Sequence, residues 1–454
     1  MGKLIRWTGG LACALCLIVL LAWGVSRALG PEHAHRQALE RMQVPWDAPG
    51  SNAFDALWLM RYPVPEGELK AMTGRDMQRI HALPPATGGG HATDFASEAA
   101  TRFADEFPGD DDLAMLCAPR DAASCLAKVA SDVPAYEALV VRHGALLERH
   151  ARLARHGHVR NRVPGRVDAP LPRFDTGRLA LTRNALLFAK GEPGVALDAT
   201  CRELDTWRRL GAQSDMLLAS IAAITYSTDG NGVLLAAMLR DLPRDHALPA
   251  SCTLALAPPR ADSLSLCPAM RGEHAFTTGA LRTMPQTWKE DASPLGRLLM
   301  PLLFNADKTV ARMAMTPAHY CDADADSRRE RDLLFDAVPS PAYGMVEFGC
   351  IDNAIGCILS SIAAPAYSGY QNRMLDHGER LRALATLVWL REQRDDTRPL
   401  AARIAARPAA LKSPAREFGI GEDGRSLRIH NYESGPRGHW EIPLPDYLSE
   451  PVAD

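Results

Sequence analysis

Residues 1–30, MGKLIRWTGGLACALCLIVLLAWGVSRALG, decide how the rest of the chain is interpreted. Lys3 and Arg6 are followed by 20 residues, 7–26, that carry no charged side chain and are rich in Leu, Ala, Val, Ile and Trp. Because a helix rises about 1.5 Å per residue, about 20 apolar residues match the roughly 30 Å hydrocarbon core of a bilayer. The stretch therefore predicts a membrane-spanning anchor at 7–26, preceded by a short cytoplasmic N-terminus at 1–6.

A cleaved signal peptide is the alternative interpretation of this stretch. Ala22-Trp23-Gly24 and Ser26-Arg27-Ala28 both resemble the small-x-small cleavage site, although the apolar part of a signal peptide is usually about 7–15 residues long. Both interpretations export residues 31–454, since no later stretch is long and apolar enough to span a bilayer. The 44 arginines against 7 lysines are typical of a GC-rich bacterial genome. We expect a single-pass protein of the bacterial inner membrane, with most of the chain in the periplasm.

The composition is that of a folded protein with a large core. Of the 454 residues, 47% are hydrophobic and 23% are charged, which allows two or three domains. Setting aside Lys3, Arg6 and Arg27 leaves 48 basic against 54 acidic residues in the exported part. This balance gives no reason to expect nucleic-acid binding, which requires a basic face.

Apolar residues recur at three- and four-residue spacing through most of the exported part, which predicts a mainly α, irregular multi-helix domain at 51–411. Residues 31–50 are expected to be a linker, and no repeat of about 34 residues indicates a solenoid. A small β-rich appendage is predicted at 412–454, because FGI, SLRIH and WEIPL alternate, with an Asp423-Gly424 turn between the first two. Helices are predicted over 51–62, 93–107, 133–156, 175–190, 195–211, 213–240, 261–284, 353–363 and 368–396, with STDGNG (227–232) as a break.

Export makes disulfides the expected state of the eight cysteines beyond the anchor. Short separations favour Cys117 with Cys125, Cys252 with Cys267 and Cys350 with Cys357, which leaves Cys201 with Cys321. Seven residues within one helix separate Cα atoms by about 10 Å, beyond the roughly 7 Å limit for a disulfide. Cys350 must therefore lie outside a helix that Asn353 caps, and Asp121 is expected to cap the helix that contains Cys125.

No metal site or cofactor is predicted. Zinc would require further ligands at tight spacing near the cysteines, and none is present. Asp322, Asp324 and Asp326 resemble the start of an EF-hand loop, but Ser327 and Leu333 occupy the positions that need Gly and Glu. We expect these acidic residues to cap the N-terminus of the following helix.

Two segments are candidates for an interaction surface. The basic segment is 142–166, and Leu139, Leu146 and Leu153 form an apolar seam along it. Its cationic residues that could contact anionic lipid, acidic polysaccharide or an acidic protein are Arg142, Arg149, Arg152, Arg155 and His156. A solvated arginine-rich face is the alternative. The second segment is 58–72. Its Trp58 and Tyr62 could dock a partner, although a position in the core or at an inter-helix corner also explains these aromatic residues.

Catalytic motifs are missing from the sequence: there is no GxSxG, HExxH, SxxK or glycine-rich phosphate loop. Glu98, Glu106, His319, His377 and the Glu273-His274 pair are isolated, so no catalytic residue is assigned. The sequence favours a membrane-anchored interaction protein of the cell envelope, acting as a partner, scaffold or protective inhibitor. An envelope hydrolase acting on lipid or cell-wall material, with its site assembled from distant residues, is the alternative.

Overall fold

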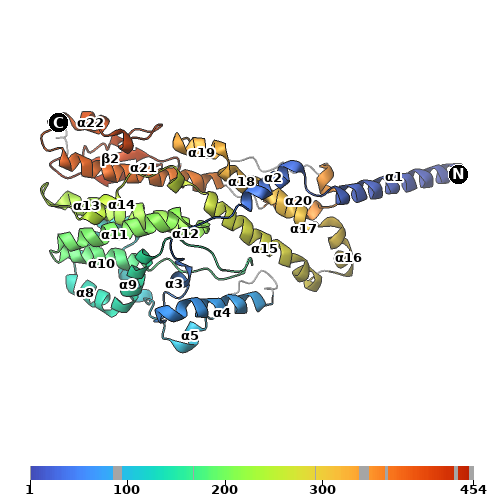
Figure 1. The fold of residues 1–454 in the computed structure, drawn as a ribbon, viewed down its shortest axis with the longest axis horizontal. Coiled ribbons are helices and arrows are strands. Elements are labelled where there is room, and N and C mark those ends of the chain that lie inside the picture. The colour runs from blue at the N-terminus through green and yellow to red at the C-terminus, as the bar shows by residue number, and fades with distance from the viewer. Residues whose placement is uncertain are drawn as a thin grey trace.

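The protein is mainly helical, with a small antiparallel sheet near its C-terminal end. The computed structural model describes residues 2–84, 95–166, 168–291, 293–336, 347–362, 367–433 and 438–448. Helix α1 (Gly2–Leu29) projects alone from one end of an elongated body, and the sheet lies toward the other end (Figure 1). Among the described residues, one helical stretch near the N-terminus is long and apolar enough to cross a membrane, and its apolar side chains are exposed.

The remaining elements form three groups along the chain. The first contains α2 (His33–Met42), α3 (Phe54–Trp58), α4 (Leu69–Ala82), α5 (Ala99–Arg102), α6 (Asp110–Met115), α7 (Ala122–Ala130), α8 (Val133–Arg142) and α9 (Gly144–Ala151). The second contains α10 (Gly177–Ala189), α11 (Pro193–Ala212), α12 (Leu217–Ile224), α13 (Val233–Asp241) and α14 (Ala250–Ala255). The third contains α15 (Cys267–Asp291), α16 (Pro294–Leu303), α17 (Ala306–Met313), α18 (Met315–Ala318), α19 (Ala323–Glu330), α20 (Ala354–Ile362), α21 (Tyr367–Glu392) and α22 (Leu400–Ala405).

The largest core surrounds α11, which packs against α10, α12 and α14. Cys201, Leu204 and Trp207 are buried along this helix. The predicted helices over 175–190 and 195–211 correspond closely to α10 and α11. Their apolar positions are close enough in sequence to define a face without knowledge of the rest of the fold.

The predicted break at STDGNG does not interrupt the helix. Residues Thr225–Gly232 form a π-helix that joins α12 to α13. A Cβ on Gly232 would lie 2.7 Å from Leu384 Cδ1, so glycine allows α21 to pack closely against this segment. Glycine therefore serves helix packing here instead of a turn.

Several predicted helices are shorter or interrupted. The helix predicted over 51–62 is reduced to α3, and the one over 261–284 begins only at Cys267, after a 3-10 turn. The segment 133–156 divides at His143 into α8, α9 and a 3-10 turn (Arg152–Arg155). In the segment 93–107 the helical part is the single turn α5, because buried Asp76 accepts hydrogen bonds from Ser97 Oγ and Glu98 N and Phe103 is extended. Residues 93 and 94, expected to cap that helix, lie outside the described residues.

The segment expected to be a linker contains α2, whose Ala38 and Met42 are buried against Ala314 and Ala318 of the α17–α18 region. Helix α2 also packs against α15. The connection between α1 and the body is therefore structured.

Polar side chains fix the end of α1 to the body. Ser26 is buried and donates a hydrogen bond to Asp352 Oδ1 over 2.6 Å. Lys308 Nζ lies 2.6 Å from the same carboxylate oxygen and 2.6 Å from the Ser26 carbonyl. Burial tends to raise the pKa of Asp352, but the bonds from Lys308 and Ser26 outweigh it and lower that pKa. We call Ser26, Lys308 and Asp352 the anchor clamp.

The predicted β appendage is present as a three-stranded antiparallel sheet, β1 (Gly419–Ile420), β2 (Ser426–His430) and β3 (His439–Pro443). Leu427 pairs with Ile442, and both are buried against the helical body. The sheet packs against α13 and α21, as its small size requires.

Arg416 connects the sheet region to the helices. Its guanidinium donates to both oxygens of Asp332 over 2.8 and 2.9 Å and to Asp376 Oδ1 over 2.6 Å. Asp332 and Asp376 are 1% and 0% exposed, so this arginine neutralises two buried carboxylates. Burial raises the pKa of Asp376, and Arg416 opposes the shift.

All eight cysteines beyond α1 are paired, but two of the four predicted pairings are wrong. The predicted disulfides Cys117–Cys125 and Cys350–Cys357 are present. Cys350 lies outside α20, as predicted. Asn353 directly precedes α20, but its Oδ1 accepts from Asn305 N and Thr309 Oγ1 over 2.8 and 3.1 Å, and Asp121 precedes α7 without capping it through its side chain. The other four cysteines form Cys201–Cys252 and Cys267–Cys321, instead of Cys252–Cys267 and Cys201–Cys321.

Long-range packing explains the two different pairings. Cys201 and Cys252 lie on α11 and α14, which pack side by side. Cys267 begins α15, and Cys321 lies in the 3-10 turn His319–Cys321 that packs near it. Sequence separation favours short loops, but the helix neighbours decide which thiols meet.

Candidate functional site

The basic segment 142–166 has the predicted apolar seam. Leu139, Leu146 and Leu153 are each 1% exposed. Its cationic side chains, however, do not form one free face. Arg142 pairs with Asp112, and Arg155 lies 3.5 Å from Glu66. Part of the predicted basic surface is therefore neutralised by acidic residues from elsewhere in the chain.

Arg149 and Arg152 differ in their partners. Arg149 lies 2.6 Å from Glu106 and donates from Nε to the Met60 carbonyl over 3.0 Å. Arg152 is half-buried, and within the described part of the chain no carboxylate pairs with it. Of the four arginines predicted for this surface, Arg152 is therefore the one with charge available for a partner.

Trp58 is half-buried at the end of α3. Its Nε1 donates to Asp76 over 2.9 Å, and its ring stacks on Phe54 with centroids 6.0 Å apart. Tyr62 is also half-buried, under the guanidinium of Arg61. Both interpretations of this segment hold in part, because the rings pack inward and still border the surface.

The chain at 52–66, which includes α3, lines two cavities, and we call it the α3 segment. The first cavity, of about 170 Å³, is lined by Leu57, Trp58 and Tyr62 of this segment. We call it the Trp58 cavity. Leu171, 49% exposed, stands at its rim, and Arg173 lies over the Phe107 ring at 4.2 Å. Its aromatic, arginine and proline lining is formed by Trp58, Arg61, Tyr62, Phe95, Phe107, Pro170, Leu171, Pro172 and Arg173.

The second cavity lined by the α3 segment measures about 160 Å³, and we call it the Arg152 cavity. Its apolar floor includes Leu59 and Val64, and its charged lining is formed by Asp55, Glu66, Lys70, Arg149 and Arg152. Asp55 pairs with Arg162, Glu66 with Arg155 and Arg149 with Glu106, so Lys70 and Arg152 are left as its cationic edge. Met60 lines both cavities. The fold thus brings together the two segments that the sequence singled out, and we call the two cavities with the α3 segment the α3 surface.

The α3 surface suits side chains of a partner protein. Cavities for drug-sized ligands usually measure about 300–1,000 Å³, so two cavities this small hold little more than a side chain each. Aromatic residues and arginine are the residue types that dominate binding energy at protein interfaces. The cationic edge beside an apolar floor favours an acidic side chain next to an apolar one.

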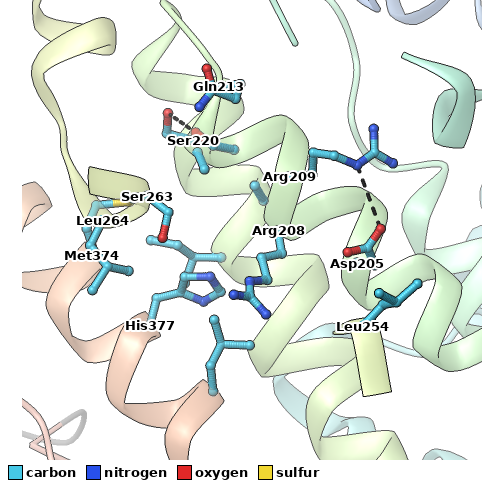
Figure 2. Close-up of a pocket in the computed structure, with 15 residues that line it drawn as sticks. Asp205, Arg208, Arg209, Gln213, Ser220, Leu254, Ser263, Leu264, Met374 and His377 are labelled. Carbon is cyan, nitrogen blue, oxygen red and sulfur yellow. Dashed lines mark hydrogen bonds and ion pairs between the residues drawn. The ribbon is translucent and has the colours of Figure 1, made fainter. Parts of the chain in front are cut away.

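A cavity of about 260 Å³ between α11 and α21 was not predicted (Figure 2). Ser220, Ser263 and His377 line it with Asp205, Arg208 and Arg209, and the His377 imidazole points toward Arg208 in Figure 2. These residues come from four separate parts of the chain, so no sequence pattern could have identified them. We call this the His377 cavity.

The chemistry of the His377 cavity is limited by the bonds its groups already make. His377 Nδ1 lies 3.1 Å from Thr228 Oγ1. Ser220 and Ser263 donate their hydroxyl protons to the carbonyls of Gly211 and Arg260. The cavity therefore holds an oriented imidazole, while both serine hydroxyls bond to the main chain.

Burial lowers the pKa of His377 to about 3, and the charges of Arg208 and Arg380 add to the shift. The folded protein keeps this imidazole neutral, whereas the unfolded chain protonates it near pH 6.5. Because the pKa of His377 is lower in the folded protein than in the unfolded chain, the unfolded chain binds the proton more tightly. The free energy of unfolding therefore decreases as the pH falls below 6.5.

Replacing His377 with asparagine is therefore expected to reduce acid sensitivity. Between pH 7.5 and pH 5, the wild type should lose about 2 kcal/mol of unfolding free energy that His377→Asn does not lose. Asparagine retains a polar atom near Thr228. Urea unfolding at the two pH values measures the difference, with exposed His81→Asn as the control. Equal acid dependence of wild type and His377→Asn would contradict a buried neutral imidazole.

The largest of these cavities, about 660 Å³, lies beside Trp389 at the C-terminal end of α21. Its size suits a small molecule. Its buried guanidinium groups bond to the main chain, because Arg391 donates to the Leu239 carbonyl over 3.2 Å and Arg244 to the Gln393 carbonyl over 2.6 Å. These arginines satisfy carbonyls at the C-terminal ends of α13 and α21.

The other isolated candidates have structural partners. Glu98 forms a two-bond ion pair with Arg75, at 2.6 and 2.9 Å. Glu273 accepts from Leu217 N, and His274 Nε2 lies 3.1 Å from the Val310 carbonyl. His319 lies 3.7 Å from Asp322, which caps α19 by accepting from Ala325 N, as predicted.

Among the described residues, no group of three or more His, Cys, Asp or Glu side chains is arranged to hold a metal ion. The comparisons assign no class either. No protein-family model matches the chain, and no curated protein or solved structure is significantly similar to it.

Proposed function

We propose that this chain is a membrane-anchored protein of the bacterial cell envelope that binds another protein through the α3 surface. The observation that carries the proposal is the placement of two side-chain-sized cavities along one segment, one aromatic and one cationic. The body would lie in the periplasm of a single-pass inner-membrane protein. No nucleic acid, metal or cofactor is part of this proposal.

The anchor clamp supports a retained anchor over a cleaved signal peptide. Ser26 is 1% exposed, and its hydroxyl lies 2.6 Å from Asp352 Oδ1 and 2.8 Å from the Phe348 carbonyl, both in the body. Cleavage after Ala28 would remove Ser26 from the protein. Cleavage after Gly24 would leave Ser26 near a free chain end, no longer held in α1 beside Asp352. The disulfides are consistent with an oxidising compartment, since cysteine pairs are rare in the reducing cytosol.

Photocrosslinking in intact cells tests the α3 surface. A photoreactive amino acid is placed at Leu171, on the rim of the Trp58 cavity, or at Lys70, on the edge of the Arg152 cavity. Val195, which is 55% exposed on α11, provides the control position. We expect both test positions to crosslink the same protein, identified by mass spectrometry, and the control position not to.

Charge reversal at the unpaired arginine adds a quantitative test. Arg152→Glu should lower the Leu171 crosslink yield about tenfold, which corresponds to about 1.4 kcal/mol of binding free energy. Arg425→Glu is the matched charge reversal, because Arg425 is exposed in the β region and no carboxylate pairs with it among the described residues; it should leave the yield unchanged. Equal crosslinking at Leu171 and Val195, or no effect of Arg152→Glu, would contradict the proposed surface.

An envelope hydrolase acting on lipid or cell-wall material is the second candidate, favoured by the oriented neutral imidazole in the His377 cavity. Such an enzyme would use His377 as a general base, which requires a neutral imidazole. Release of fatty acid or glycan fragments by the purified protein, lost in His377→Asn but retained in His81→Asn, would establish this alternative.

A further inference from the structure

Helix α16 exposes a row of leucines to solvent. Its sequence, PLGRLLMPLL, contains one charged residue and no acidic residue. The large apolar side chains exposed on it are Leu295 at 64%, Leu298 at 67%, Leu299 at 40% and Leu302 at 43%. A contiguous apolar surface of this kind on a folded protein marks a contact with another apolar surface.

The helix lies at the end of the body from which α1 projects (Figure 1). Trp23, in the last part of the apolar stretch of α1, donates from Nε1 to the Leu302 carbonyl over 2.7 Å. Arg27 donates to the Phe304 carbonyl, directly after α16, over 3.3 Å. Trp and Arg are the residue types that mark the membrane–water interface. The hydrogen bonds therefore place α16 at the depth where α1 leaves the bilayer.

Neighbouring elements extend the apolar surface. Phe348, 45% exposed, lies in the 3-10 turn Phe348–Cys350 that packs against α1. Ile358, 36% exposed, lies on α20, which packs against α16. The exposed apolar side chains at this end thus come from three elements around the base of α1.

We propose that α16 is a second membrane-contacting element, an interfacial helix whose leucines enter the leaflet that α1 leaves. The occupant of the leucine face is the acyl-chain boundary of the lipid. The inference rests on the proposed anchor, because α1 brings this surface to the bilayer. The anchor clamp holds the base of α1 against the body, so the span and the leucine face meet the membrane together. An amphipathic helix of this kind lies in the plane of the interface.

Spin labels on the full-length chain in phosphatidylethanolamine–phosphatidylglycerol vesicles test the inference. Native Cys16, exposed on α1, reports on the anchor in a Cys13→Ser background. Leu298→Cys reports on α16 and Leu254→Cys on α14, both with Cys13 and Cys16 replaced by serine. Leu254 is the matched control because it is a leucine 70% exposed on a helix of the body. Collision with oxygen, which concentrates in lipid, is compared with collision with a water-soluble nickel chelate.

We expect the labels at Cys16 and Leu298 to show an oxygen-to-nickel collision ratio several-fold higher than the label at Leu254. A lipid-like ratio at Cys16 with a water-like ratio at Leu298 would overturn the interfacial helix and leave the anchor in place. A water-like ratio at Cys16 would overturn the anchor and the inference together. Shielding of Leu298 from both reagents would show that a protein, such as a second copy of this chain, covers the leucines, and would also overturn the inference.

Discussion

Replacing Arg416 with methionine is expected to lower the free energy of unfolding by about 3–5 kcal/mol. Methionine keeps much of the side-chain length but leaves the carboxylates of Asp332 and Asp376 buried without their cation. Removing one partner of a buried ion pair is costly, because the remaining charge is shielded from water. The loss should be smaller at pH 5 than at pH 8, since protonation of the abandoned carboxylates relieves part of it.

Urea unfolding in mild detergent, with the disulfides intact, measures this effect. Arg425→Met is the matched control, because Arg425 is exposed in the same β region and its change should stay within about 0.5 kcal/mol. Equal unfolding free energies for Arg416→Met and Arg425→Met would contradict the prediction. They would show that Arg416 does not stabilise the packing of the sheet region against the helices.

Features that depend on neighbours in sequence were predictable. The long apolar N-terminal helix, the helices α10, α11 and α21 and the three strands follow from local spacing, which needs no knowledge of the tertiary fold. The Cys350–Cys357 disulfide follows from the short separation of the two cysteines. Because one helix cannot contain both bridged cysteines, the position of Cys350 outside α20 follows as well.

Features that depend on distant segments could not be predicted. The partners of Cys201 and Cys267 depend on which helices pack side by side, and the sequence does not contain that information in a local pattern. The basic segment was overestimated as a free surface because the neutralising residues, such as Asp112 and Glu66, lie elsewhere in the chain.

The candidate site shows the same division. The sequence singled out Trp58 and Arg152 separately, but only the fold shows that one segment lines both of their cavities. The His377 cavity had no sequence signal, because its lining comes from α11, α12, the 3-10 turn Asp262–Leu264 and α21. Sequence spacing can therefore identify individual residues of a binding surface. It does not show which of those residues lie next to one another in the fold.

The second large effect is expected at the anchor clamp. Lys308→Met removes the nearest cation from Asp352, which is 0% exposed. The carboxylate keeps the Ser26 hydroxyl at 2.6 Å, the Asn305 amide at 3.4 Å and the more distant Arg27 guanidinium at 3.9 Å. We expect the unfolding free energy to fall by about 3–5 kcal/mol. Adding Asp352→Asn should restore part of the loss, since a neutral amide still accepts from Ser26 without an uncompensated charge.

Because the clamp lies at the end of α1, its loss should be detectable as local opening at that end of the helix. Ser26, Lys308 and Asp352 hold the end of α1, so their opening should expose the peptide bond after Arg27 to trypsin before the body unfolds. Cleavage there should be about ten times faster in Lys308→Met, which corresponds to about 1.4 kcal/mol of local opening. Lys190→Met, which removes an exposed ion pair with Glu137, should leave cleavage unchanged. An unchanged cleavage rate in Lys308→Met would mean that the clamp does not hold α1, and the fixed relation between the span, α16 and the body would then lose its physical basis.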